Sequence, residues 1–127
     1  MPIELVEINP TTLHLIFQGQ WRWEELYDRS KEMQQALDAA NHKLHILVDA
    51  RASGKMPEGA LTHLRKLSRD DHDNLGLVII VGADTFMQAI ASVIGAIYPN
   101  FRRYRFVSTM EEAQEILAAQ RQKQDDS

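Results

Sequence analysis

A run of seven residues, Leu75–Val81 (LGLVIIV), contains only aliphatic side chains and one glycine. A strand with one face in water alternates polar and apolar residues, whereas a continuous aliphatic run predicts a strand that is covered on both faces. Strands of this kind occupy the centre of parallel sheets that lie between layers of helices. The run therefore restricts the chain to a layered α/β fold.

The apolar pattern of the remaining chain switches repeatedly between the period of strands and the period of helices. Turn residues at 9–12 (NPTT) favour an antiparallel hairpin for the first two strands. We expect strands at 3–8, 13–17, 44–48, 75–81 and 104–107, and helices at 23–40, 57–67, 85–98 and after Thr109. The predicted fold class is α/β: a five-stranded mixed, mostly parallel sheet with helices on both faces, in the order β-β-α-β-α-β-α-β-α.

Length and charge exclude several classes of protein. At 127 residues the chain suits one domain, expected at 1–120, with a polar, frayed tail at 121–127. A net charge of −4 argues against nucleic-acid binding, which needs a cationic excess. The basic segment 102–105 (RRYR) is interpreted as a solvated turn in preference to a phosphate site.

The expected location is the cytoplasm, without membrane insertion. The first residues lack the basic and apolar regions of a signal peptide, and no apolar run reaches the roughly 20 residues of a membrane helix. The absence of cysteine excludes disulfides, cysteine zinc sites and a thiol nucleophile.

The sequence carries no signature of an enzyme, so we expect no catalytic residue, metal or cofactor. There is neither a phosphate-binding glycine loop nor a Gly-x-Ser-x-Gly motif. His14 and His45 are expected to share a sheet face, but no third metal ligand accompanies them. His63 is placed on an exposed helix face, and His42 and His72 in loops.

Several residues are expected at the carboxyl edge of the sheet, where sites in α/β proteins gather. Asp49 and Arg51 form either a salt bridge or part of a polar site, and the salt bridge is preferred. The two tryptophans are either contacts for a partner or rings packed under the first helix, and packing is preferred. The expected interaction edge consists of Trp21, Trp23, Asp49, Arg51, Pro57 and Glu58.

The helix expected at 85–98 contains no charged residue. We expect its inward stripe to consist of Phe86, Ile90, Val93, Ile94 and Ile97. A helix that is apolar all round is usually buried all round, so its outer face predicts either a homodimer or an apolar ligand. The residues expected on this dimer or ligand helix are Met87, Gln88, Ala91, Ser92, Gly95 and Tyr98.

The order of elements and three short stretches resemble the STAS-like family, the anti-sigma-factor-antagonist-like proteins. The stretches are 21–25 (WRWEE), 48–51 (VDAR) and 57–64, and the resemblance covers essentially the whole chain. More closely, the chain is similar to diverged members that lack the phosphorylation motif. The resemblance implies a non-catalytic regulatory module that contacts another protein.

The phosphorylation motif of switching STAS proteins, Asp-Ser-Ser-Gly-Leu, falls on residues 57–61 of this chain. Gly59 occupies the phospho-acceptor position and has no hydroxyl, so we expect no phosphorylation there. Ser53 is the nearest hydroxyl. The leading interpretation is a homodimeric interaction module, and the alternative is a carrier of a small molecule or lipid along the helix 85–98.

Overall fold

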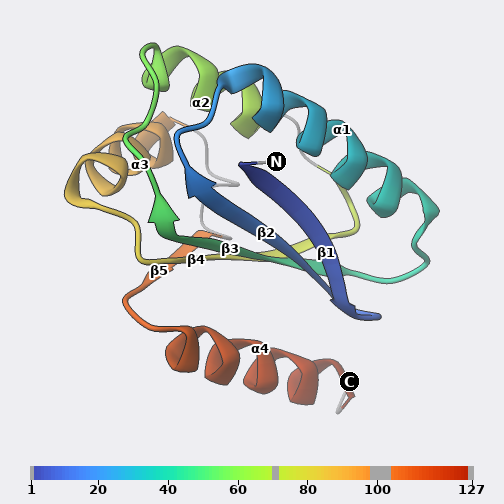
Figure 1. The fold of residues 1–127 in the computed structure, drawn as a ribbon. Coiled ribbons are helices and arrows are strands. Elements are labelled where there is room, and N and C mark those ends of the chain that lie inside the picture. Colours follow the sequence, from blue (N-terminus) through green and yellow to red (C-terminus); the bar gives the residue numbers. More distant parts are fainter. Residues whose placement is uncertain (1, 70–71, 98–103, 126–127) are drawn as a thin grey trace.

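A computed structural model describes residues 2–69, 72–97 and 104–125, and within them the chain forms one five-stranded sheet. The strands lie side by side in chain order, β1-β2-β3-β4-β5 (Figure 1). β1 pairs with β2 antiparallel, and every later pair is parallel. The predicted fold class and element order are therefore confirmed. The strands are β1 (Ile3–Asn9), β2 (Thr12–Gly19), β3 (Leu44–Ser53), β4 (Leu75–Val81) and β5 (Tyr104–Val107).

The order of the strands explains where the helices lie. Each parallel connection steps to the next strand in the same direction, and right-handed crossovers then place every connecting helix on one face. Figure 1 shows α1, α2 and α3 on that face and α4 on the other. The helices are α1 (Trp23–Ala39), α2 (Ala60–Arg69), α3 (Thr85–Ile97) and α4 (Met110–Asp125).

β4 lies between β3 and β5 and contributes to both cores, as the aliphatic run predicts. Val78 and Ile80 pack in the core beneath α1, α2 and α3. Ile79 and Val81 are fully buried beneath α4, beside Ala113. The alternating residues of one strand thus stabilise both layers.

α4 covers only part of its face of the sheet. The buried residues beneath α4 come from β3 and β4, whereas Val6 and Ile8 of β1 are 42% and 46% exposed on this side of the sheet. Because these two large apolar side chains are exposed, this end of the sheet face is available to solvent or to a partner.

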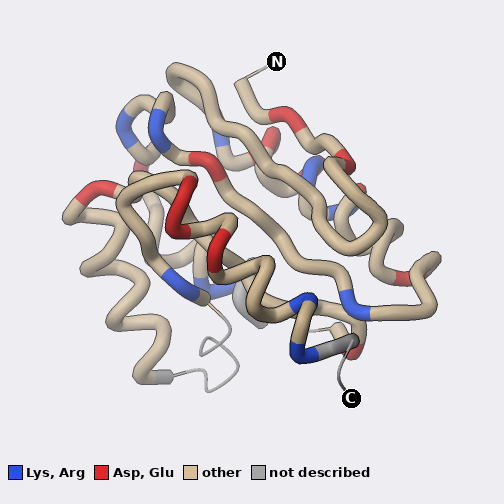
Figure 2. Tube along the Cα trace, turned by 90° about the horizontal axis from the view of Figure 1, so that it is seen from below, with Lys and Arg blue, Asp and Glu red and all other residues tan. Residues whose placement is uncertain are grey.

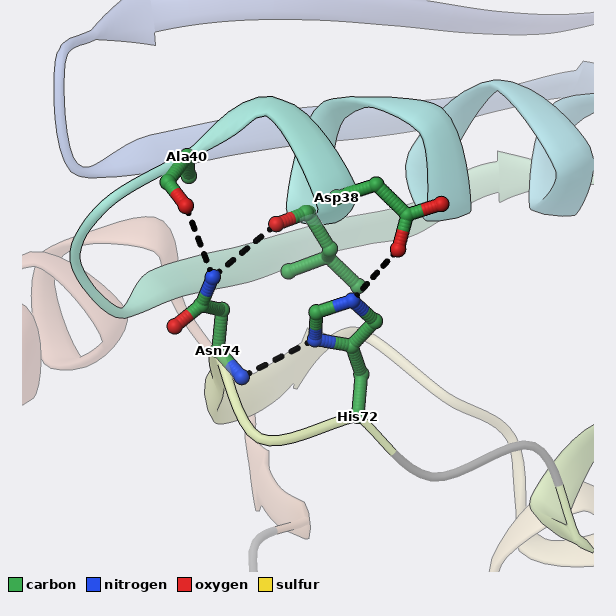
Figure 3. Close-up of polar contacts among 5 residues, drawn as sticks. Asp38, Ala40, His72 and Asn74 are labelled. Carbon is green, nitrogen blue, oxygen red and sulfur yellow. Dashed lines mark hydrogen bonds and ion pairs between the residues drawn. The ribbon is translucent and has the colours of Figure 1, made fainter.

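The carboxyl end of α1 is held by the loop before β4 (Figure 3). The side-chain amide of Asn74 donates to the carbonyl oxygens of Leu37 (3.0 Å) and Ala40 (2.9 Å). His72 Nε2 donates to the carboxylate of Asp38 at 2.8 Å, and its Nδ1 accepts from the backbone N–H of Asn74 at 3.0 Å. The Asn74 amide satisfies the carbonyl of Ala40 and adds a second hydrogen bond to that of Leu37, which also accepts from the backbone N–H of Ala40. Together with the His72–Asp38 contact, these bonds fix the position of α1 over the sheet.

Two predicted boundaries are wrong. β3 continues to Ser53, because Ala52 and Ser53 pair with the end of β2 after a shift of register, so Asp49 lies within the strand and not at its end. α2 begins at Ala60 and not at Pro57. Gly59 has a φ of 84°, in the left-handed region, and a right-handed helix cannot include that conformation.

The predicted buried stripe of α3 also needs correction, and α2 exposes a large apolar residue as well. In α3, Phe86 and Val93 are 55% and 49% exposed, and the inward residues include Ala91 and Ile94. A helix that is apolar all round carries no sequence signal for which side faces the sheet. In α2, Leu61 is 40% exposed. The side chain of Ile97 lies outside the described residues.

None of the helices in the part of the chain that the structure describes combines the length and the apolar character needed to cross a membrane.

Candidate functional site

The apolar layer between the sheet and the helices α1, α2 and α3 is not completely filled. A cavity of about 150 Å³, the inner cavity, lies between the sheet and these helices. A second cavity of about 260 Å³, the outer cavity, lies toward the carboxyl ends of β3 and β4. The two cavities adjoin each other, because both are lined by Phe17, Leu26, Val48, Leu64, Ile80 and Met87.

The inner cavity is almost entirely apolar. Its described lining contains no side chain that is charged at neutral pH, and its polar side chains are Ser30, Gln34 and Tyr104. The wall on the side of the sheet is formed by residues such as Ile46 and Val78. A concave, apolar surface with a few polar groups is the usual form of a small-molecule site.

The outer cavity is more polar. Arg51, Ser53 and Asp84 line it together with the backbone around Gly54 and Gly82. Asp84 caps α3, because its Oδ1 accepts from the backbone N–H of Met87 at 2.8 Å. Parallel strands end here, at the edge where α/β proteins place their ligands.

Trp21 and Trp23 are packed residues, which is the preferred of the two sequence interpretations. They are 4% and 6% exposed. Trp21 makes edge-to-face contacts with Phe17 (5.0 Å between ring centroids) and with Trp23 (4.9 Å). Its Nε1 donates to Ser53 Oγ at 2.9 Å. Ser53 is the residue that the sequence offered as the nearest hydroxyl to the phospho-acceptor position, and this hydroxyl is therefore engaged in a hydrogen bond. Trp21 therefore contributes to the wall of the outer cavity.

Trp23 joins α1 to α2. Its Nε1 donates to the backbone carbonyl of Glu58 at 2.7 Å. His63 stacks on the indole, and the Tyr27 hydroxyl and His63 Nδ1 form a hydrogen bond of 2.9 Å. The expectation that His63 sits on an exposed face is wrong, because the turn at Gly59 directs this side of α2 toward α1.

Asp49 and Arg51 form the salt bridge that the sequence favoured. Arg51 Nε and Nη2 donate to Asp49 Oδ1 (2.9 Å) and Oδ2 (2.8 Å), and the Arg51 backbone N–H also donates to Oδ1. These hydrogen bonds lower the pKa of Asp49 and raise the pKa of Arg51. A Cβ at Gly82 would lie 2.7 Å from Arg51 Cγ, so this glycine makes room for the arginine.

His14 lies on the same sheet face as Asp49. Burial lowers its pKa, the negative charge of Asp49 opposes that shift, and Arg51 adds to it. His45 shares this face but uses its Nδ1 to accept from the backbone N–H of Leu77 at 2.9 Å. Within the residues that the structure describes, no group of three His, Asp or Glu side chains could hold a metal ion.

The remaining predicted site residues that the structure describes lie in three places. Pro57 and Glu58 lie in the segment before α2, where the Glu58 side chain is exposed. Met87 and Ala91 face the inner cavity. Gln88, Ser92 and Gly95 are exposed on the outer side of α3, which carries no charged residue (Figure 2). Tyr98 lies outside the described residues.

The sequence interpretation missed Gln34 as a cavity residue. Gln34 lies one helical turn after Ser30 on the same side of α1, and both line the inner cavity. The signal that could have found Gln34 is its spacing: Ser30 and Gln34 are polar residues at i and i+4, beside the apolar residues of the same helix.

No protein-family model matches the sequence, and no curated protein matches it. The structure is similar to the crystal structure of an uncharacterized DUF3478-family protein with a SpoIIAA-like fold from Shewanella loihica PV-4. The TM-score is 0.63, the sequence identity is 16%, and the match covers 91% of each chain. A likeness at this identity shows the fold alone. The chain has a SpoIIAA-like, that is STAS-like, fold, as the resemblance implies.

Proposed function

We propose that the chain is a non-catalytic module that binds a small apolar molecule between its sheet and the helices α1, α2 and α3. The observation that carries the proposal is the inner cavity, whose described lining is apolar and uncharged. Ligand sites are concave and mostly apolar, with few polar groups. A carrier, the alternative drawn from the sequence, thus has more structural support than the homodimeric interaction module, which was the leading interpretation.

The size of the cavity indicates the size of the ligand. A dry cavity of about 150 Å³ lined by Leu, Ile and Phe accommodates a ring of about six carbon atoms. The inner cavity has a volume of about 150 Å³ and a similar lining, although it is partly open to solvent. The outer cavity adjoins it, so a longer molecule that passes between the two would reach the carboxyl edge of the sheet.

A series of straight-chain alcohols from butan-1-ol to dodecan-1-ol tests the proposal by calorimetry. Each methylene buried is worth about 0.8 kcal/mol, so the affinity should rise about fourfold per carbon and then level off when the cavities are full. An affinity that is absent, or that rises without levelling off, would contradict binding in a bounded cavity.

The outer face of α3 supports a second function, the homodimeric interaction module inferred from the sequence. Phe86 and Val93 are large, apolar and exposed on this helix, and exposed Gly95 permits close approach of another backbone. A surface without charge suits a second copy of itself, because a two-fold axis places the same residues opposite one another.

Light scattering at high protein concentration tests this second function. A dimer should be present in the wild type and lost in Val93→Lys, which places a charge in the contact, whereas Arg121→Lys, a control on exposed α4, should leave it intact. A strict monomer in the wild type would exclude the homodimer and leave the ligand proposal standing.

A further inference from the structure

Two polar side chains of the inner cavity have no hydrogen-bond partner in the described part of the chain. Ser30 and Gln34 lie one turn apart on α1, and both are partly buried. Residues at i and i+4 share one face of a helix, so both side chains lie on the side of α1 that lines the cavity. The structure gives neither of them a hydrogen bond or an ion pair.

The polar atoms of Ser30 and Gln34 remain accessible to water, because neither side chain is among those with a fully buried, unpaired polar atom. A ligand that displaces this water must supply hydrogen bonds in its place, because a polar group that loses water without gaining a partner costs free energy. The hydroxyl of Ser30 and the amide of Gln34 can each donate and accept. They therefore match a ligand hydroxyl or carbonyl. Between them they present one polar position in a lining that is otherwise almost entirely apolar.

The charges around the compartment favour an uncharged ligand. The described lining of the inner cavity contains no charged side chain, so an ion there would have no counter-ion. In the outer cavity, Arg51 is already paired with Asp49 through two hydrogen bonds, and the remaining charge is the carboxylate of Asp84. A carboxylate ligand would thus meet a negative charge and no free cation among the described lining residues.

We propose that the ligand is an apolar molecule with one uncharged hydrogen-bonding group, an alcohol or a carbonyl, which is bound by Ser30 and Gln34. This inference rests on the proposed function and adds the chemical class of the ligand.

Calorimetry with three probes of one length tests the inference: octan-1-ol, 1-chlorooctane and octanoate, at neutral pH. The variant is Gln34→Met, which keeps the length of the side chain and removes its hydrogen-bonding groups. The matched control is Gln35→Met, the same change at the next residue of α1, which is exposed.

For the wild type, octan-1-ol should bind at least about tenfold more tightly than octanoate. Gln34→Met should weaken the affinity for octan-1-ol about fivefold, which corresponds to one hydrogen bond of about 1 kcal/mol. The same variant should leave 1-chlorooctane unchanged or bind it more tightly. Gln35→Met should match the wild type for all three probes.

Two results would overturn the inference while leaving the apolar site intact. The first is octanoate binding as tightly as octan-1-ol. The second is an unchanged ratio of octan-1-ol to 1-chlorooctane affinity in Gln34→Met. If none of the probes binds, the proposed function itself fails, and the inference fails with it.

Discussion

The imidazole ring of His63 stacks on the indole ring of Trp23, with 4.8 Å between the ring centroids and 20° between the ring planes. The contact joins α2 to the first turn of α1, and Tyr27 strengthens it through its hydrogen bond to His63. Leu26 on α1 and Leu64 on α2 line both cavities, so this cluster of rings holds two walls of the compartment together.

Replacement of His63 by alanine removes the stacked ring and the hydrogen bond to Tyr27. His63→Ala should lower the free energy of unfolding by about 1–3 kcal/mol, the sum expected for an aromatic contact and one hydrogen bond. Urea denaturation measures the change. His42→Ala, at an exposed loop histidine, should stay within about 0.5 kcal/mol of the wild type; equal effects of the two variants would show that the ring cluster contributes nothing.

Asn74 fixes the carboxyl end of α1 (Figure 3). Asn74→Ala leaves the carbonyl of Ala40 without this partner and removes one of two hydrogen bonds to the carbonyl of Leu37, and should cost about 1–3 kcal/mol of unfolding free energy. Asn41→Ala changes an exposed residue of the loop that follows α1 and serves as the control. Hydrogen exchange should show faster opening in the last turn of α1 for Asn74→Ala alone, and exchange unchanged from the wild type would refute this role.

The Asp49–Arg51 pair predicts a dependence of stability on pH. The pKa of Asp49 is lowered in the folded state, chiefly by the hydrogen bonds from Arg51, from its ordinary value of 3.8. The pair therefore stabilises the fold above that value, and the contribution is lost as the pH falls through the lower folded pKa. Because Arg51 is half exposed, Asp49→Asn should cost only about 1 kcal/mol at neutral pH.

Denaturation of the wild type and of Asp49→Asn across the acidic range measures this effect. The difference between them should shrink below about pH 4. Asp73→Asn, at an exposed loop aspartate, is the control. A difference that stays constant with pH would show that ionisation of Asp49 is not its origin.

His14 predicts a second pH effect, nearer to neutrality. Burial lowers its pKa below the ordinary value of 6.5, so the unfolded chain takes up the proton first as the pH falls. The stability that neutral His14 contributes is present above about pH 6.5 and is lost as the pH falls through the folded pKa. His14→Gln should therefore flatten the curve of unfolding free energy against pH between about pH 7 and about pH 5. Parallel curves for His14→Gln and the wild type would contradict this.

Much of the fold could be predicted from the sequence, because its strongest patterns are set by burial. The aliphatic run Leu75–Val81 can be stable only between two layers, and the structure places it there. Boundaries that depend on pairing between strands were less accessible: the extension of β3 to Ser53 follows from its register with β2, which no local pattern encodes.

The candidate site was harder to predict, because it depends on packing between elements and not on a local sequence pattern. The orientation of α3 is decided by packing against the sheet, and a helix without charged residues has no polar face that would reveal it. Phe86 was therefore expected inside and lies outside, whereas Ala91 lies inside. The cavity itself depends on how three helices fit over the sheet, which no local sequence pattern encodes. Gln34 looked like a surface residue because glutamine is mostly exposed.

Ligand binding to two variants of α3 tests the central claim most directly. Ala91→Phe fills the inner cavity, which Ala91 lines, whereas Ala89→Phe places the same ring on the exposed side of the helix. Calorimetry with octan-1-ol should show affinity at least about tenfold weaker for Ala91→Phe, with its fold retained by circular dichroism, and unchanged affinity for Ala89→Phe. Equal binding by a folded Ala91→Phe and by the wild type would show that the ligand does not occupy this cavity.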